Sequence, residues 1–207
     1  MQQMIYDRDG ERKYLTNMER KRFLDVSGTF EPDTMTLCWV ISATGCRISE
    51  ALALTDRSID REAKMIIVEC LKKRRRGVYR SIPVPAALIE LVQKVHGIGH
   101  HGPPGGESRR LWTFSRMTAY RRICKVMDAA GLSGSQAMPK GLRHCFGVTA
   151  VQSRVPLNLV QRWLGHADMR TTAIYTGAIG PEERSIALRM WRHHAMTFPS
   201  RCEVAAE

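Results

Sequence analysis

The sequence contains no long apolar run. No hydrophobic stretch approaches the roughly 18 residues that a membrane-spanning helix needs, and the first residues lack the apolar core of a secretory signal peptide. These absences argue against a membrane or secreted protein and favour a cytoplasmic one.

Cysteine pairs with metal-binding or redox spacing are also missing. The six cysteines, at positions 38, 46, 70, 124, 145 and 202, form no C-x-x-C motif. Cys38, Cys70 and Cys145 sit inside apolar stretches, where a free cysteine behaves as a small core residue. We therefore expect reduced thiols rather than a disulfide framework.

Metal ligands are equally scarce. His96, His100 and His101 form one histidine cluster, and they lie in a glycine-rich stretch without an acidic or cysteine partner at helical spacing. We expect no metal site there. No internal repeat is apparent, so repeat architectures are not indicated.

Positive charge is plentiful by contrast. The 207 residues include 32 Lys and Arg against 20 Asp and Glu, a formal net charge of +12 with a pI near 9.9. Such an excess favours a polyanionic partner, and the basic residues cluster at 72–76 and 109–125. With 43% hydrophobic residues, the chain can also bury an ordinary core.

Helix start and stop signals recur along the chain. Thr16 and Glu19 have the spacing of a capping box for a helix to about Val26. Proline or serine opens the other predicted helices, at 32–43, 85–95, 115–130, 139 onward, 156–165 and 181–194. A shorter helix is predicted to carry Arg47, Glu50 and Leu54.

Two strands are predicted at 65–70 and 78–84, joined by the basic turn around Gly77. The predicted fold class is mainly α with a small antiparallel β-sheet (α+β). We expect a flexible lead-in over residues 1–13, a catalytic domain over 14–180, and a C-terminal helix and tail over 181–207.

Four short segments concentrate the residues that suit phosphate chemistry: Thr44–Arg47, Lys140–Arg143, Leu164–His166 and Ala173–Thr176. They supply arginine, lysine and histidine together with Tyr175, which lies nine residues after His166. Fixed cations stabilise the negative charge that spreads over a phosphate in its transition state, and the planar guanidinium can grip two oxygens. This set suits attack on a DNA phosphodiester by a tyrosine hydroxyl.

On these segments, from about Tyr14 to Trp191, the chain resembles the tyrosine recombinases (phage-type integrases). Arg47 and Glu50 match the family's T-G-x-R-x-x-E segment, and Arg143 lies the usual 23 residues before His166. The family fold is a tyrosine recombinase catalytic domain. Lys140 departs from the pattern: it stands where the family usually has histidine, as in the K-x-x-R of some type IB topoisomerases.

The resemblance implies a role for each matching residue. Tyr175 is the expected nucleophile, Arg47, Arg143 and His166 bind the phosphate, and Lys140 supplies a further cation. Lys72, with Lys73 as second choice, is the expected hairpin acid for the leaving 5′-oxygen, and Lys73, Arg74, Arg75 and Arg76 contact backbone phosphates. Glu50 either orients Arg47 or forms an ordinary surface ion pair, and His144 supports the neighbouring helices.

The resemblance further implies a site-specific recombinase that works on double-stranded DNA as a homotetramer, without metal or ATP. An accessory DNA-binding protein or domain is a further expected partner, since the chain leaves no room for the family's N-terminal helical domain. The segment from Pro181 either packs on a neighbouring protomer or folds back on its own domain.

Two other functions stay open. A type IB topoisomerase-like relaxing enzyme would use the same chemistry, and Lys140 favours it. A non-catalytic DNA-binding regulator would use residues 155–172 as a helix-turn-helix, with Gly165 in the turn. The recombinase hypothesis requires five side chains to converge on one phosphate, with the phenol within its reach: Arg47, Lys140, Arg143, His166 and Tyr175.

Overall fold

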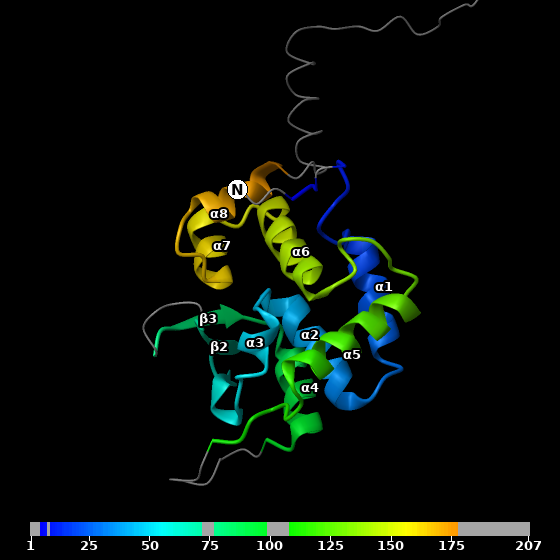
Figure 1. The fold of residues 1–207 in the computed structure, drawn as a ribbon. Helices are drawn as coiled ribbons and strands as arrows, with labels where there is room; N and C mark the ends of the chain where they lie inside the picture. Colours follow the sequence, from blue (N-terminus) through cyan, green and yellow to red (C-terminus); the bar gives the residue numbers. More distant parts are fainter. Residues whose placement is uncertain (1–4, 8, 72–76, 99–107, 178–207) are drawn as a thin grey trace, which may run out of the picture.

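The computed structural model describes residues 5–7, 9–71, 77–98 and 108–177. Within these ranges the chain is mainly helical, with one small sheet to one side of the helices (Figure 1), which confirms the predicted fold class. The longer helices are α1 (Asn17–Ser27), α2 (Pro32–Thr44), α4 (Ala86–His96), α5 (Arg116–Ala129), α6 (Pro139–Gln152) and α7 (Leu157–Leu164). The shorter elements are α3 (Ile48–Ala51), α8 (Arg170–Ala173) and the 3-10 helices η1 (Asp56–Ser58) and η2 (Ile174–Gly177).

Local signals in the sequence explain where the helices begin. The Thr16 hydroxyl accepts from the backbone N–H of Glu19, and the Glu19 carboxylate accepts from the backbone N–H of Thr16, so the predicted capping box is confirmed. At the start of α5, the Ser115 hydroxyl accepts from the backbone N–H of Thr118. Pro32 and Pro139 occupy first-turn positions of α2 and α6, where the missing N–H is not needed.

The sheet is antiparallel with strand order β1-β2-β3 (Ile59–Asp60, Met65–Glu69 and Tyr79–Pro83). The two predicted strands are confirmed, whereas the two-residue β1 is too short to leave a pattern in the sequence. Register pairs Ile66 with Ile82 and Val68 with Arg80. Because side chains alternate along a strand, these four share the buried face of the sheet.

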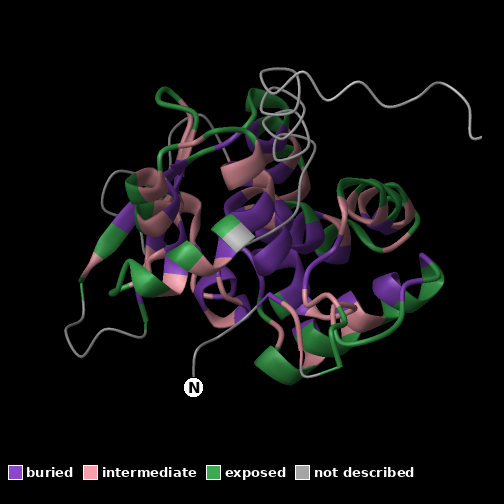
Figure 2. Cartoon of the chain, turned by 90° about the horizontal axis from the view of Figure 1, so that it is seen from above, coloured by how far each residue is buried: buried purple, intermediate pink, exposed green. Residues whose placement is uncertain are grey.

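Two apolar clusters hold the helices together. The larger one joins α1, α2, α4, α5, α6 and the sheet, and α2 contacts α4 and α6 at its centre. The smaller one joins α6, α7 and η2 with the N-terminal residues and includes Ile5, Val148, Leu164 and Tyr175. Figure 2 shows the buried residues gathered on the inner faces of these elements.

Two expectations differ from the structure. The helix after Gly45 is a single turn, with Arg47 at its N-cap and Leu54 beyond its end. The described part of the lead-in is not loose: Ile5 is buried, and its carbonyl accepts from the N–H of Lys13. The reason is that Ile5 adds apolar area to the smaller cluster. The predicted helix from Pro181 lies outside the described residues.

Candidate active site

Arg47 enters the site because α2 ends at a glycine. Gly45 adopts the left-handed conformation with φ +60, which glycine accepts without steric cost, and the chain turns there into α3. Arg47 Nη1 then lies 2.9 Å from Glu50 Oε1, with Glu50 only 1% exposed and the Arg47 side chain 28% exposed. Glu50 therefore orients Arg47 from the interior, and its alternative interpretation as a surface ion pair is wrong.

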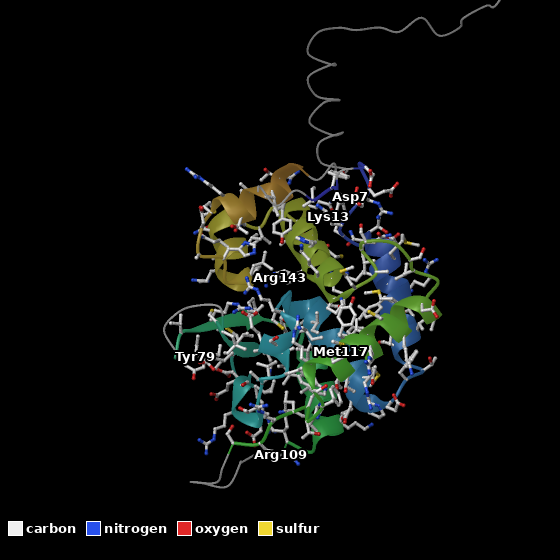
Figure 3. All side chains as sticks on the ribbon, viewed as in Figure 1. Asp7, Lys13, Tyr79, Arg109, Met117 and Arg143 are labelled. Atoms are coloured by element: carbon white, nitrogen blue, oxygen red, sulfur yellow. The ribbon has the colours of Figure 1, made fainter. Side chains whose placement is uncertain are left out.

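Arg143 is the fifth residue of α6 and is buried. Its guanidinium donates to the carbonyl of Gly45 at 2.7 Å and to that of Leu164 at 2.8 Å. Figure 3 shows Arg143 between α6 and α7 on one side and α2 on the other. Burial, followed by the charge of Arg47, lowers the pKa of Arg143 to about 10, so the side chain stays cationic at neutral pH.

His166 follows the turn that ends α7, where Gly165 adopts φ +66. Its Nδ1 lies 2.9 Å from the Thr172 hydroxyl, which fixes the ring beside α8. Burial, then the charges of Arg143 and Arg47, lower the pKa of His166 to about 3. The imidazole is therefore neutral and close to both arginines.

Tyr175 completes the cluster from η2. Its ring stacks on that of His166, with centroids 6.2 Å apart and planes at 15°. Burial raises the pKa of the phenol, while the charges of Arg143 and Arg47 oppose that rise. The structure therefore brings Tyr175, His166, Arg143 and Arg47 together from four separate segments.

The phenol, however, is not exposed to a phosphate in this conformation. Tyr175 is 1% exposed, and its hydroxyl lies 3.2 Å from His144 Nδ1. The ring fills a slot over Gly147, where an added Cβ would lie 2.6 Å from the ring. The sequence did not reveal this placement, because the apolar contacts of the ring decide it and the motif spacing does not.

His144 thus has a more specific position than the expected support of neighbouring helices. It is buried, and its Nε2 has no hydrogen-bond partner among the described residues. Burial, then the charge of Lys140 one turn earlier on α6, lower its pKa to about 4. Lys140 itself is exposed. An imidazole therefore lies beside the Tyr175 hydroxyl, although Lys140 stands where the family usually has histidine.

Arg80 is the main residue of the site that sequence reasoning missed. It lies on the buried face of β3, and its Nη2 contacts Glu50 Oε2 at 2.7 Å with both side chains nearly inaccessible. A signal was present in the sequence. Two-residue alternation places Arg80 on the same face as Ile82, and a charge on a buried face requires a partner.

Several predicted features lie outside the described residues: Lys72, Lys73, Arg74, Arg75, Arg76, His100 and His101.

His96, which is described, lies 3.0 Å from the Thr36 hydroxyl and packs edge-on against Trp112. Among the described residues, no group of three His, Cys, Asp or Glu side chains is placed to bind a metal ion. In the same ranges, no helix has both the length and the apolar character needed to cross a bilayer.

The helix-turn-helix interpretation of residues 155–172 does not fit the structure. The helix after the Gly165 turn, α8, has only four residues, and it leads directly into η2 and Tyr175. A recognition helix must reach several base edges along a groove, which one helical turn cannot do. The segment instead positions His166 and Tyr175 side by side.

Burial of histidine side chains, nearly complete for His144 and partial for His96 and His166, makes stability depend on pH. Folding lowers the pKa values of His96, His144 and His166 below the ordinary 6.5. A buried neutral histidine stabilises the fold fully above about pH 6.5, and this contribution is lost as the pH falls toward the folded pKa. We expect the free energy of unfolding, measured by denaturant titration, to fall between pH 7 and pH 5. His144→Gln should make this decline less steep. An unchanged slope of unfolding free energy against pH would mean that His144 does not contribute to the decline.

A family model provides the first comparison with known proteins. The model described as "Phage integrase family" matches residues 13–179. The tyrosine recombinase XerD of Caulobacter vibrioides is 32% identical over 151 residues, covering 68% of this chain and 48% of that protein. The tyrosine recombinase XerC of Erythrobacter litoralis is 27% identical over 159 residues, covering 77% of this chain and 50% of that protein. The chain spans about half the length of these relatives.

Solved structures agree with this result. A XerH site-specific recombinase bound to its palindromic difH substrate, in a post-cleavage complex, aligns with a TM-score of 0.71 and 26% identity. The alignment covers 87% of this chain and 53% of that one. The catalytic domain of bacteriophage HP1 integrase aligns with a TM-score of 0.61 and 19% identity, covering 89% of this chain and 98% of that one, and it supports the fold.

Proposed function

The chain belongs to the phage integrase family, and we propose that it is a site-specific recombinase that cleaves and rejoins double-stranded DNA through a 3′-phosphotyrosine intermediate. The observation that carries this proposal is the meeting of Arg47, Arg143, His166 and Tyr175. The charges of both arginines act on His166 and on Tyr175. Four segments far apart in the sequence thus form one cationic cluster around a tyrosine.

The phosphate-binding donors have separate tasks in the proposed reaction. Arg47 keeps a partly exposed side chain and makes the first contact with the scissile phosphate. Arg143 and His166 line the wall behind it and donate to the non-bridging oxygens as negative charge develops. Because these donors are already fixed by Glu50, Gly45 and Thr172, little reorganisation accompanies the reaction.

Bonds and protons balance without a cofactor. The Tyr175 oxygen forms a bond to phosphorus as its proton passes to water, and the bond from phosphorus to the 5′-oxygen breaks. The 5′-oxygen takes a proton from Lys72, the proposed acid, and rejoining reverses these steps. The phosphodiester energy is retained in the protein–DNA bond, so neither ATP nor a metal ion enters the scheme.

Attack requires a second conformation of residues 170–177. In the described one, the Tyr175 hydroxyl contacts His144 and is closed off from solvent. We propose that binding of DNA shifts the population toward a state in which this contact is broken. The phenol then swings out of its slot over Gly147 to reach the phosphate.

A nicked suicide duplex tests the proposal. Cleavage next to the nick releases a short fragment, so rejoining fails and the covalent adduct accumulates. The expected result is an adduct that mass spectrometry maps to Tyr175. Absence of an adduct would favour the non-catalytic DNA-binding regulator instead.

A type IB topoisomerase-like enzyme remains the second candidate, because Lys140 is exposed at the start of α6 where a DNA backbone can reach it. The two activities differ in stoichiometry. A relaxing enzyme acts as a monomer, whereas a recombinase needs a synapse of two sites. Relaxation of supercoiled plasmid at one protein per plasmid would therefore favour the topoisomerase.

The recombinase proposal includes a homotetramer on DNA. An apolar groove of about 610 Å³ lies between α1, α2, α4, α6 and α7, with Trp39 and Leu91 among its lining residues. Residues 181–196 outside the described ranges carry Ile186, Leu188, Met190 and Trp191. We propose that this segment of a neighbouring protomer occupies the groove and that assembly completes the site.

The basic run at 72–76 should set the salt dependence of DNA binding. Neutralising Lys72, Lys73, Arg74, Arg75 and Arg76 together is expected to flatten the plot of log K against log salt by up to about 4 units, since each phosphate contact contributes about 0.9. Fluorescence anisotropy at several salt concentrations measures the slope. Neutralising the exposed Lys21 and Lys94 is the control. An unchanged slope in the five-residue variant would mean that the run faces away from DNA.

A further inference from the structure

The buried face of β3 presents a charge where an apolar residue would be expected. Arg80 pairs with Val68 across the sheet and lies next to Ile82 on the same face. Its side chain is 3% exposed. Each nitrogen of the Arg80 guanidinium already donates to a protein acceptor, so we expect Arg80 to act through the groups that it touches.

Arg80 touches three other elements of the site. Its Nε donates to the carbonyl of Trp163 at 2.7 Å, near the end of α7, and its Nη1 donates to Cys70 Sγ at 3.1 Å, just after β2. The two Nη atoms reach both Glu50 oxygens, at 2.7 and 3.4 Å. Burial alone would raise the pKa of Glu50, but the hydrogen bond and charge of Arg80 hold it below its usual value.

Glu50 is the acceptor that Arg80 shares with Arg47. Oε1 accepts from Arg47 Nη1 at 2.9 Å, and Oε2 accepts from the Arg47 backbone N–H at 2.8 Å. While Arg80 occupies both oxygens, only one nitrogen of the Arg47 guanidinium is held by the carboxylate. Without Arg80, Glu50 could take a bidentate grip on Arg47 and compete with a phosphate for it.

Arg80 also packs against the turn that presents His166. A Cβ added to Gly165 would lie 2.9 Å from Arg80 Nη1. The guanidinium therefore occupies the space beside Gly165, and its bond to Trp163 fixes the preceding turn of α7. One side chain thus contacts the segments that carry Arg47 and His166, two of the three proposed phosphate-binding groups.

We propose that Arg80 is a positioning residue that acts through Glu50 on Arg47 and through the Trp163–Gly165 turn on His166. The inference rests on the proposed recombinase function. Arg80 holds the two donors at the spacing that a phosphate requires and keeps Glu50 from neutralising Arg47.

Four proteins test the proposal: the wild type, Arg80→Met, Glu50→Gln and the double variant. Single-turnover cleavage of the nicked duplex, duplex affinity and thermal midpoint are measured for each. Arg80→Met should slow cleavage by roughly a hundredfold, as expected for a small misplacement of catalytic groups, with duplex affinity changed by less than about tenfold, because one phosphate contact is a small part of binding. The double variant should be no slower than the slower single variant, since the two residues act as a unit.

A methylphosphonate at the scissile position shows whether Arg80→Met slows cleavage by misplacing the phosphate-binding groups or only by destabilising the fold. It replaces a charged oxygen with a methyl group, so the reaction depends less on correctly placed arginines, and the deficit of Arg80→Met should shrink. If Arg80→Met does not fold, the double variant, which leaves no unpaired buried charge, serves for the same comparison.

The possible outcomes lead to different conclusions. Two outcomes would overturn the role of Arg80 while the wild type still cleaves normally. In one, the cleavage losses of the two single variants multiply in the double variant. In the other, Arg80→Met is slowed equally on the phosphate and the methylphosphonate substrates. Failure of the wild-type protein to form any adduct would overturn the recombinase function and this proposal together.

Discussion

Tyr175→Phe is expected to abolish covalent attachment to DNA while leaving the fold and duplex binding in place. The substitution removes only the hydroxyl, which is the sole atom proposed to attack phosphorus. Loss of a nucleophile elsewhere reduces turnover by roughly a millionfold, so adduct formation should fall below detection. The ring keeps its stacking on His166 and its slot over Gly147, and stability should change by no more than about 1–3 kcal/mol for the lost contact with His144.

The matched control is Tyr120→Phe, which removes a hydroxyl from the exposed face of α5. It should leave the adduct yield on the nicked duplex unchanged. An adduct that persists in Tyr175→Phe and maps to another residue would remove Tyr175 from the mechanism.

Arg143→Ala is expected to reduce cleavage by roughly 10²–10³-fold, the usual loss when one fixed donor to a transition-state oxyanion is removed. Duplex affinity should change by less than about tenfold, because one phosphate contact is a small part of binding. The structure adds a cost in stability. Arg143 donates to the carbonyls of Gly45 and Leu164, and a buried acceptor that loses its partner costs about 1–3 kcal/mol.

Arg143→Lys separates the loss of cleavage from the loss of stability. Lysine keeps the charge but cannot hold two carbonyls and a phosphate oxygen in one plane, so cleavage should stay low while part of the stability returns. Single-turnover cleavage, anisotropy and thermal unfolding report the three quantities, and Lys94→Ala controls for the loss of one exposed positive charge on α4. Parallel losses of binding and cleavage in Arg143→Ala would contradict a role confined to the reaction step.

Much of the fold could be predicted from local signals. Thr16 with Glu19, Pro32, Ser115 and Pro139 mark helix starts that the structure confirms, because capping depends on residues within one turn. The predicted length of the helix after Gly45 was wrong, because no local sequence signal indicates that it ends at Ala51. The contact of Ile5 with the core was missed because it depends on residues far along the chain.

The residues that carry the family motifs could be predicted from the sequence, whereas the contacts between distant segments of the site could not. Motif spacing indicated Arg47, Arg143, His166 and Tyr175, which the structure places together, but their catalytic roles stay predictions. Arg80 was missed because its pairing with Glu50 spans 30 residues and depends on how β3 packs against α3. The contact of Tyr175 with His144 depends on where η2 seats against α6, which motif spacing does not encode.

Gly147 has a consequence for how readily the protein reacts. The slot that shelters the phenol exists because α6 lacks one methyl group at that position. In the proposed mechanism, a larger residue there would displace the Tyr175 ring and shift the balance between its sheltered and available states, with no change to the side chains proposed to contact DNA. We therefore expect the reactivity of Tyr175 to be adjustable from a position that carries no chemistry of its own.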